Sequence, residues 1–206
     1  MDHASLIQAA TQTLIDHVDE LTALDSAIGD GDHGLNMKRG ALAIQARLRD
    51  GKDAGSLNET LKGAGATCMS TIGGSSGPVF GTLLMTLARE LPAEPGPHDF
   101  AAALAAGIAS LTRLGKAEAG QKTLLDVLDP VQRLLAASNP GSPDLEARVR
   151  QCAFDSAAAT AAMDAIRGRA SFLGERALGH VDPGSRSMAL IIAAICDGLS
   201  EARTTP

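Results

Sequence analysis

The stretch Asp25-Ser-Ala-Ile-Gly-Asp30-Gly-Asp32-His33-Gly34 places three carboxylates within eight residues and separates them with glycines. Like charges held this close repel by roughly a few kcal/mol per pair in a partly dry site, and a hard divalent cation removes the repulsion. A helical pattern starts just after His33, and the N-terminus of a helix attracts anions. Carboxylates for a metal beside backbone N–H groups for phosphate therefore predict a Mg-nucleotide site.

Two other interpretations of this stretch lead to different chemistry. A calcium-binding loop that starts at Asp30 needs glycine at its sixth position and a bidentate glutamate at its twelfth. Leu35 and Ala41 occupy those positions, so the spacing excludes that loop. A solvated acidic turn, with an aspartate as helix cap, stays open because Asp-Gly turns are common.

Length and composition narrow the class of protein. A chain of 206 residues is long enough for one domain with a sizeable core, and we expect a single domain over 1–206. The net charge of −6 and the lack of a basic run argue against nucleic acid or an anionic membrane surface as partner. No signal peptide, membrane-length apolar run or metal-type cysteine spacing is present, so we expect a cytoplasmic protein.

Apolar residues recur at three- and four-residue steps along the chain, and no segment alternates with period two. This pattern predicts an all-α fold of eight helices, joined by short loops that make neighbours antiparallel. The predicted helices cover 7–21, 37–48, 57–72, 80–91, 100–111, 124–135, 143–166 and 188–199. Pro130 lies inside the sixth pattern and predicts a kink or a split there.

The loops between up-and-down helices alternate between the two ends of the bundle. The loops after the first, third, fifth and seventh helices are the glycine-rich ones, and they fall at the same end. Ser75 and Ser76 add hydroxyl donors to the second of these loops, and Arg169 adds a fork-shaped donor to the fourth. Asp182 can cap the last helix with Pro183 at its first position. We therefore expect one site, built by four loops at one end.

Taken together, these loops resemble the nucleotide-binding L subunit of bacterial dihydroxyacetone kinases. The resemblance lies in LDSAIGDGDHGLNMKRG (24–40), GGSSGPVFG (73–81), GKAEAGQKTLLDVLDP (115–130) and GRASFLGERALGHVDPGSRS (168–187), and so spans nearly the whole chain. It implies an antiparallel up-and-down barrel of eight helices with ADP or ATP and Mg²⁺ at one end. The chain departs from the family pattern at Leu124, where we expect Met, at Gln121, where we expect Asp, and at Phe172, where we expect Tyr.

The resemblance also implies roles for individual residues. Two Mg²⁺ ions would be bound by Asp25, Asp30 and Asp32. The nucleotide would be bound by His33, Gly34, Leu35, Asn36, Ser75, Ser76, Gly115, Leu124, Arg169, Asp182, Pro183 and Gly184. No catalytic nucleophile is implied on this chain, since phosphoryl transfer depends mainly on positioning and charge neutralisation.

In this family the keto substrate, dihydroxyacetone, is held by a separate K subunit. The string at 33–37, His-Gly-Leu-Asn-Met, favours the phosphotransferase-system type, in which bound ADP is recharged by a phosphohistidine M subunit. Three alternatives remain: an ATP-dependent subunit for dihydroxyacetone or a related sugar such as erythrulose, a non-catalytic nucleotide-binding regulatory module, and a purely structural bundle. A homodimer is compatible with each.

Overall fold

Helices account for all the regular structure in the part of the chain that is described. The computed structural model describes residues 2–51, 55–139 and 141–204, and no strand occurs among them. The α-helices are α1 (His3–Asp16), α2 (Val18–Ile28), α3 (His33–Arg49), α4 (Leu57–Thr71), α5 (Ser76–Glu90), α6 (Pro97–Gly115), α7 (Leu125–Ala136), α8 (Leu145–Ala159) and α9 (Pro183–Thr204), with 3₁₀ segments η1 (Thr160–Ala162) and η2 (Arg169–Ala177). The predicted all-α class is confirmed.

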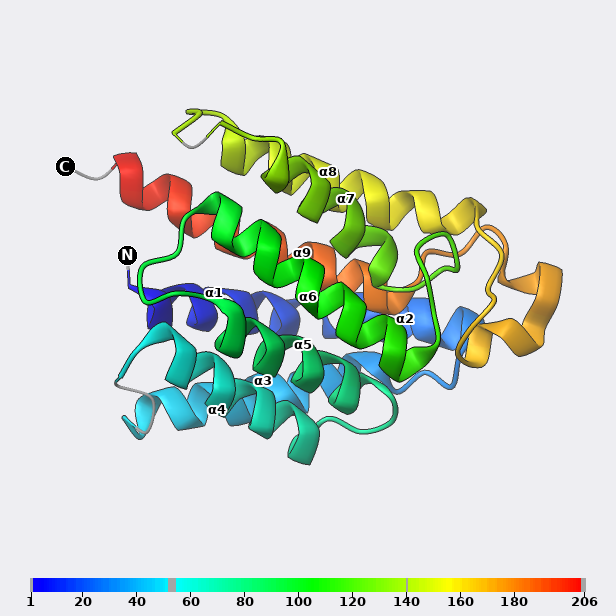
Figure 1. Ribbon diagram of the computed structural model, residues 1–206. Coiled ribbons are helices and arrows are strands. Elements are labelled where there is room, and N and C mark those ends of the chain that lie inside the picture. Colours follow the sequence, from blue (N-terminus) through cyan, green and yellow to red (C-terminus); the bar gives the residue numbers. More distant parts are fainter. Residues whose placement is uncertain (1, 52–54, 140, 205–206) are drawn as a thin grey trace.

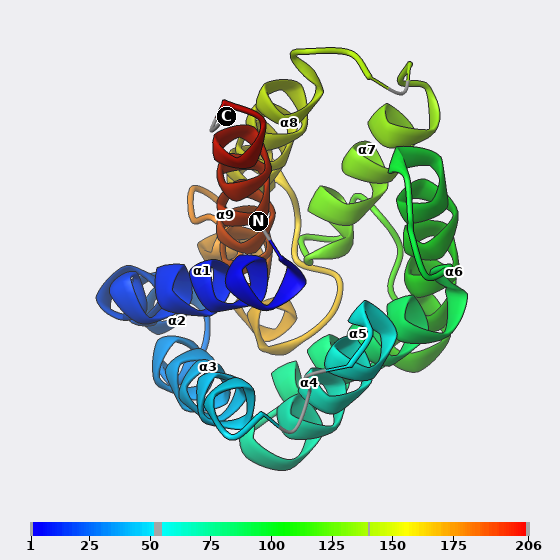
Figure 2. The ribbon, with the colours of Figure 1, turned by 90° about the vertical axis from the view of Figure 1, so that its left-hand side faces the viewer.

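The helices pack in the order of the chain. From α3 to α9 each α-helix contacts the next, α9 also packs on α1, and α1 packs on α3, so the contacts return to their starting point (Figure 2). The helices run lengthwise in Figure 1, with both termini towards one end. Among the described helices, none is both long and apolar enough to cross a membrane. The loops at the end away from the termini are the four glycine-rich loops.

The core lies between the helices. Leu21, Met37, Val127, Leu128 and Val131 are at most 2% exposed and belong to one cluster of buried apolar side chains. These residues come from α2, α3 and α7, which lead into or out of the glycine-rich loops. Packing of the core therefore fixes the helix ends that carry the site.

The prediction of one helix over 7–21 is wrong, because the helix is interrupted at His17. The ring Nδ1 of His17 lies 2.8 Å from the Thr13 carbonyl oxygen, and His17 has φ −105° and ψ 19°, outside the helical range. The ring and the His17 backbone N–H, which donates at 3.2 Å, thus compete for the same carbonyl oxygen. A second helix, α2, starts at Val18 and ends at Ile28, just before Asp30 and Asp32.

The prediction of a helix to Ile166 is also wrong, since α8 ends at Ala159. The Thr160 hydroxyl donates to the Ala157 carbonyl at 2.6 Å, the chain tightens into η1, and Met163 is extended. The split predicted at Pro130 as one of two outcomes does not occur, because α7 continues as one helix from Leu125 to Ala136. The other outcome, a kink at Pro130, stays a prediction.

Candidate functional site

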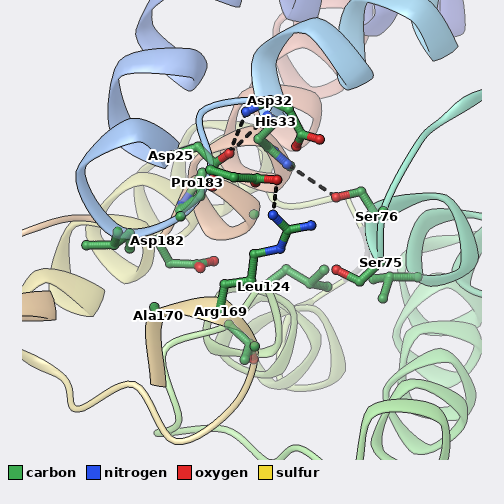
Figure 3. A pocket seen from close by; sticks show the side chains of 18 of the residues that line it. Asp25, Asp32, His33, Ser75, Ser76, Leu124, Arg169, Ala170, Asp182 and Pro183 are labelled. Atoms are coloured by element: carbon green, nitrogen blue, oxygen red, sulfur yellow. Dashed lines mark hydrogen bonds and ion pairs between the residues drawn. The ribbon is translucent and has the colours of Figure 1, made fainter. Parts of the chain in front are cut away.

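A pocket opens at the loop end of the molecule, and all four glycine-rich loops line it (Figure 3). The predicted site residues on its wall are Asp25, Asp30, Asp32, His33, Ser75, Ser76, Leu124, Arg169, Asp182, Pro183 and Gly184. The glycine-rich loops therefore meet at one end of the molecule, as expected from the sequence. The pocket has an acidic side, a side formed by the start of α5, and a side formed by the α6–α7 loop and the start of α9.

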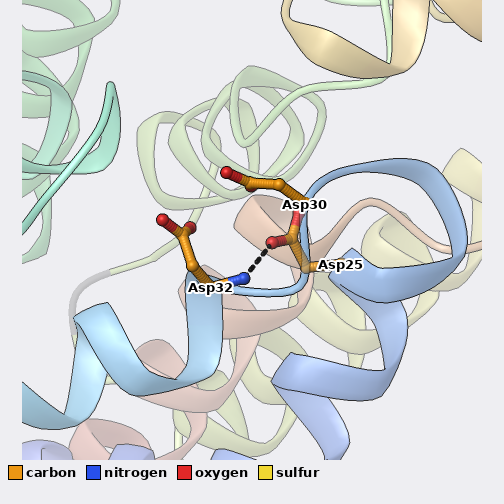
Figure 4. A group of neighbouring side chains, drawn as sticks. All are labelled: Asp25, Asp30 and Asp32. Atoms are coloured by element: carbon orange, nitrogen blue, oxygen red, sulfur yellow. Dashed lines mark hydrogen bonds between the residues drawn. The ribbon is translucent and has the colours of Figure 1, made fainter.

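The acidic side consists of Asp25, Asp30 and Asp32 (Figure 4). One ligand atom from each carboxylate lies within 4.8 Å of the others. Asp25, at the end of α2, is 9% exposed, and its Oδ2 accepts the N–H groups of Asp32 at 2.9 Å and His33 at 3.1 Å. Asp25 therefore holds the start of α3, and its carboxylate is still close enough to those of Asp30 and Asp32 to share a metal ion with them. Three clustered carboxylates form a hard oxygen donor set of the kind that Mg²⁺ prefers.

His33 connects three helices behind the acidic side. Its Nδ1 lies 3.3 Å from the hydroxyl of Ser76 and its Nε2 lies 3.1 Å from the hydroxyl of Ser187. The Ser187 hydroxyl donates to the Gly184 carbonyl at 3.0 Å, so it accepts from Nε2–H, and Ser76 then donates to Nδ1. Burial lowers the pKa of His33, although the charges of Asp25 and Asp32 act in the opposite direction. The neutral ring thus fixes the Ser76 hydroxyl at the start of α5 and adds no charge to the site.

Arg169 supplies positive charge at the opening of the pocket. Its guanidinium forms an ion pair with the Asp30 carboxylate, and the two side chains are 61% and 41% exposed. Arg169 is the first residue of η2 and follows Gly168, whose φ of 73° turns the chain. Across the pocket, Ser75 and Ser76 start α5, where free backbone N–H groups and the helix dipole favour an anion.

The start of α9 forms a side of the pocket next to the acidic cluster, with Pro183 beside Asp25 and His33 (Figure 3). Asp182 Oδ2 accepts the Ser185 N–H at 2.6 Å, and Pro183 is the first helical residue, as predicted. Burial raises the pKa of Asp182 to about 6, and the charge of Asp126 adds to this. The ammonium of Lys122 opposes the shift. Burial in turn lowers the pKa of Lys122, against the charges of Asp182 and Asp164.

Four residues implied by the resemblance do not line the pocket: Gly34, Leu35, Asn36 and Gly115. Gly34 lies under α2, and an added Cβ would lie 2.8 Å from the backbone nitrogen of Thr22. Leu35 is 54% exposed, Asn36 is buried, and Gly115 is exposed at the end of α6. The glycine at position 34 is therefore explained by the close approach of α2 and α3.

Several pocket residues were not among the predicted site residues. Lys122 and Thr123 lie beside Leu124, Gly73 and Gly74 precede the two serines, and Phe80 forms part of the wall with 5% exposure. Their position inside the four quoted strings was the available signal. Phe80 thus adds an aromatic side chain to the pocket wall.

A family model described as the DAK2 domain matches residues 27–197. The chain belongs to the DAK2 domain family. It is 36% identical over 176 residues to the PEP-dependent dihydroxyacetone kinase 1, ADP-binding subunit DhaL, of Listeria innocua, covering 85% of this chain and 84% of that one. It is 39% identical over 175 residues to the PEP-dependent ADP-binding subunit DhaL of Escherichia coli, covering 82% of both. The human Triokinase/FMN cyclase is 35% identical over 199 residues, which are 95% of this chain and 35% of that protein.

Two solved structures of one kinase are similar to this chain. The dihydroxyacetone kinase of C. freundii in its native form superposes with a TM-score of 0.77 and 26% identity, over 97% of this chain and 34% of that one. The same kinase in complex with AMP-PNP and Mg²⁺ superposes with a TM-score of 0.72 and 28% identity, over 97% and 33%. The DAK2 chain described here therefore spans about a third of those kinase chains.

Proposed function

We propose that this chain is the ADP-binding subunit of a dihydroxyacetone kinase, a single L-type domain that presents a phosphoryl group to a keto sugar held by a separate K subunit. The observation that carries the proposal is the single pocket that joins the Asp25–Asp30–Asp32 cluster to the start of α5 and to Arg169. The relatives from Listeria innocua and Escherichia coli, both named ADP-binding subunits of PEP-dependent kinases, support it.

The three carboxylates would hold Mg²⁺, with two ions expected, and the ions would neutralise the charge of the phosphates and fix their orientation. Asp25 has a second task in this assignment, since one of its oxygens accepts two backbone N–H groups. The carboxylate donor set fits a hard cation, and the complex of the C. freundii kinase with AMP-PNP and Mg²⁺ supports the pairing of metal and nucleotide.

The other residues would bind the nucleotide on both sides of the metal. At the start of α5 the Ser75 hydroxyl and the free backbone N–H groups, that of Ser76 included, would donate to phosphate oxygens, and Arg169 would give its planar guanidinium to the same phosphates. Leu124, Pro183 and Phe80 would give apolar walls for the base and ribose. None of these groups is a nucleophile, which suits a reaction catalysed by positioning and charge.

We also propose that the phosphoryl donor is a phosphohistidine M subunit that recharges bound ADP. The names of the PEP-dependent and PTS-dependent relatives support this type. The alternative is direct use of ATP, on dihydroxyacetone or a related sugar such as erythrulose, and the bound AMP-PNP in the C. freundii kinase favours it. Turnover with ATP alone, compared with turnover driven by phosphoenolpyruvate through the M subunit, separates the two.

The isolated chain should not phosphorylate dihydroxyacetone, and activity should appear when its own K subunit is added. The opening of the pocket must face the partner, so Arg176→Glu, an exposed change on η2, should weaken assembly more than Mg-ADP binding. Coupled turnover and calorimetric titration with purified components measure both. Phosphorylation of the sugar by the isolated chain would contradict the subunit assignment, and absence of Mg-ADP binding would contradict the nucleotide site.

A further inference from the structure

Lys122 is the largest fully buried side chain in the described part of the protein, with 2% exposure. A lysine is almost never buried to this degree unless its charge is paired. The residue also has a φ of 60°, which a non-glycine residue adopts only when the surrounding structure requires it. The protein therefore accepts two unfavourable features at one position of the α6–α7 loop.

The ammonium of Lys122 binds the C-terminal end of a helix. Its Nζ donates to the Thr160 carbonyl at 2.7 Å and to the Met163 carbonyl at 3.3 Å. Thr160 follows the last residue of α8 and Met163 follows the last residue of η1, and the helix dipole is negative at such an end. The Thr160 carbonyl also accepts the Met163 N–H at 3.1 Å. The carboxylates of Asp182 and Asp164 also act on the ammonium and favour its charged form. The cation is thus satisfied by carbonyl groups and nearby negative charge.

Three further bonds join the same segments. The Ile166 N–H donates to the Gln121 carbonyl at 3.4 Å, the Asp182 N–H donates to the Thr160 hydroxyl at 3.0 Å, and the Ser185 hydroxyl donates to the Thr123 carbonyl at 2.8 Å. Lys122 therefore stands where three segments meet: 121–124, 160–166 and 182–185. Each of these segments either lines the pocket or leads directly into a residue that does.

We propose that Lys122 is a positioning residue that holds the 160–166 segment so that Arg169 lies at the acidic cluster. Arg169 follows Met163 by six residues, and its guanidinium reaches Asp30 in this arrangement. Without the ammonium, the Met163 carbonyl loses this donor and the Thr160 carbonyl keeps the Met163 N–H, so the chain that leads to Arg169 is less constrained. The inference rests on the proposed function, since it assigns Lys122 to the placement of a phosphate-binding arginine.

The test is a double-mutant cycle on Mg-ADP affinity, measured by calorimetric titration. Lys122→Met, with a side chain of similar length and no charge, should weaken binding by about tenfold, as loss of a residue that supports a ligand-binding group commonly does. The matched control is Lys116→Met, which removes an exposed positive charge from a residue of the same loop that also has positive φ. It should change affinity less than about twofold.

The decisive arm is Lys122→Met in the background of Arg169→Ala. If Lys122 acts through Arg169, the second change should weaken affinity by less than about twofold in that background, because coupled residues are not additive. A full, additive loss would overturn the proposal and assign Lys122 to direct contact with the ligand. Unchanged affinity in Lys122→Met would overturn it as well.

Two controls keep the outcomes distinct. If Lys122→Met does not fold, Lys122→Gln retains an N–H donor for the helix end and carries the same cycle without the charge. Thermal unfolding of each variant distinguishes a loss of stability from a loss of affinity. A loss of stability with unchanged affinity in the folded protein would contradict a positioning role. Failure of the wild-type chain to bind Mg-ADP would contradict the proposed function, whereas binding by wild type and Lys122→Met alike contradicts only this inference.

Discussion

The three aspartates of the acidic cluster should differ in what they contribute to stability, although all three are assigned to metal. Asp25 is 9% exposed and accepts two backbone N–H groups, whereas Asp30 and Asp32 are exposed. Hydrogen bonds to a charged group contribute about 1.5–3 kcal/mol each. Removing any one of the three carboxylates relieves a similar repulsion with the remaining charges. This contribution to the free energy of unfolding therefore cancels when the alanine variants are compared with one another. Asp25→Ala should therefore be about 3 kcal/mol less stable than Asp32→Ala.

The Asp30→Ala variant gives a second reference. It loses an ion pair with Arg169 that is largely exposed, and such pairs contribute about 0–1 kcal/mol. Its stability without metal should stay near that of the wild type. Urea unfolding at pH 7 with a chelator measures all three, and a difference of 3 kcal/mol corresponds to roughly 6–12 °C in Tm for a chain of this size.

The same three alanine variants can also be compared in Mg-ADP binding. All three alanine variants should lose metal-dependent ADP binding, and Asp30→Ala and Asp32→Ala should lose phosphoryl transfer while the helical content is kept. Equal stability of Asp25→Ala and Asp32→Ala would refute the assignment of Asp25 as the residue that holds the start of α3. Wild-type turnover with Mg²⁺ in Asp30→Ala or Asp32→Ala would refute the metal site.

Three other outcomes follow from the site and its surroundings. ADP with Mg²⁺ should stabilise the fold by about 2.7 kcal/mol at a hundred times its Kd, and much less with a chelator; equal shifts in Tm would contradict the metal bridge. Gly34→Ala should cost about 1–3 kcal/mol in urea unfolding, because its Cβ would press on the Thr22 backbone. Gly40→Ala should also destabilise, because its Cβ would overlap the buried Ile72 side chain and the gain of about 1 kcal/mol in helix propensity offsets only part of that cost. Burial raises the pKa of Asp182 to about 6, so the folded state binds its proton more tightly than the unfolded state. Stability should therefore fall by up to about 3 kcal/mol as pH rises from 4 to 7, and the Asp182→Asn variant should lack this slope.

The pattern of the sequence predicted the helices and the end of the molecule that carries the site, because both depend on periodicity and loop order. Apolar steps of three and four residues report which face of a helix is buried, and glycine-rich loops after alternate helices must meet if neighbours are antiparallel. The errors occurred where a side chain competes for a backbone carbonyl. His17 and Thr160 both act in this way, and periodicity carries no information about such bonds.

The same limit applied inside the site. The carboxylates, Ser75, Ser76 and Arg169 were identifiable because their residue types suggest ligands for metal and phosphate. Sequence could not separate Asp25 from its neighbours, since the difference is one of burial and hydrogen bonding. It also assigned Gly34 to the nucleotide by resemblance, where the structure supplies a packing reason.

The arrangement around Lys122 shows why motif and geometry give different information about the third glycine-rich loop. The string GQKTLLDVLDP contains one lysine that suggests a phosphate ligand by type, yet its ammonium is directed at the carbonyl groups that end α8 and η1. A helix that continued to Ile166, as periodicity predicted, would give the Thr160 and Met163 carbonyls another arrangement than the one that binds the ammonium. The early end of α8, the burial of Lys122 and the position of Arg169 at Asp30 are therefore parts of one arrangement. In the proposed role of Lys122, the positive charge that Arg169 brings to the acidic cluster therefore depends on the end of α8.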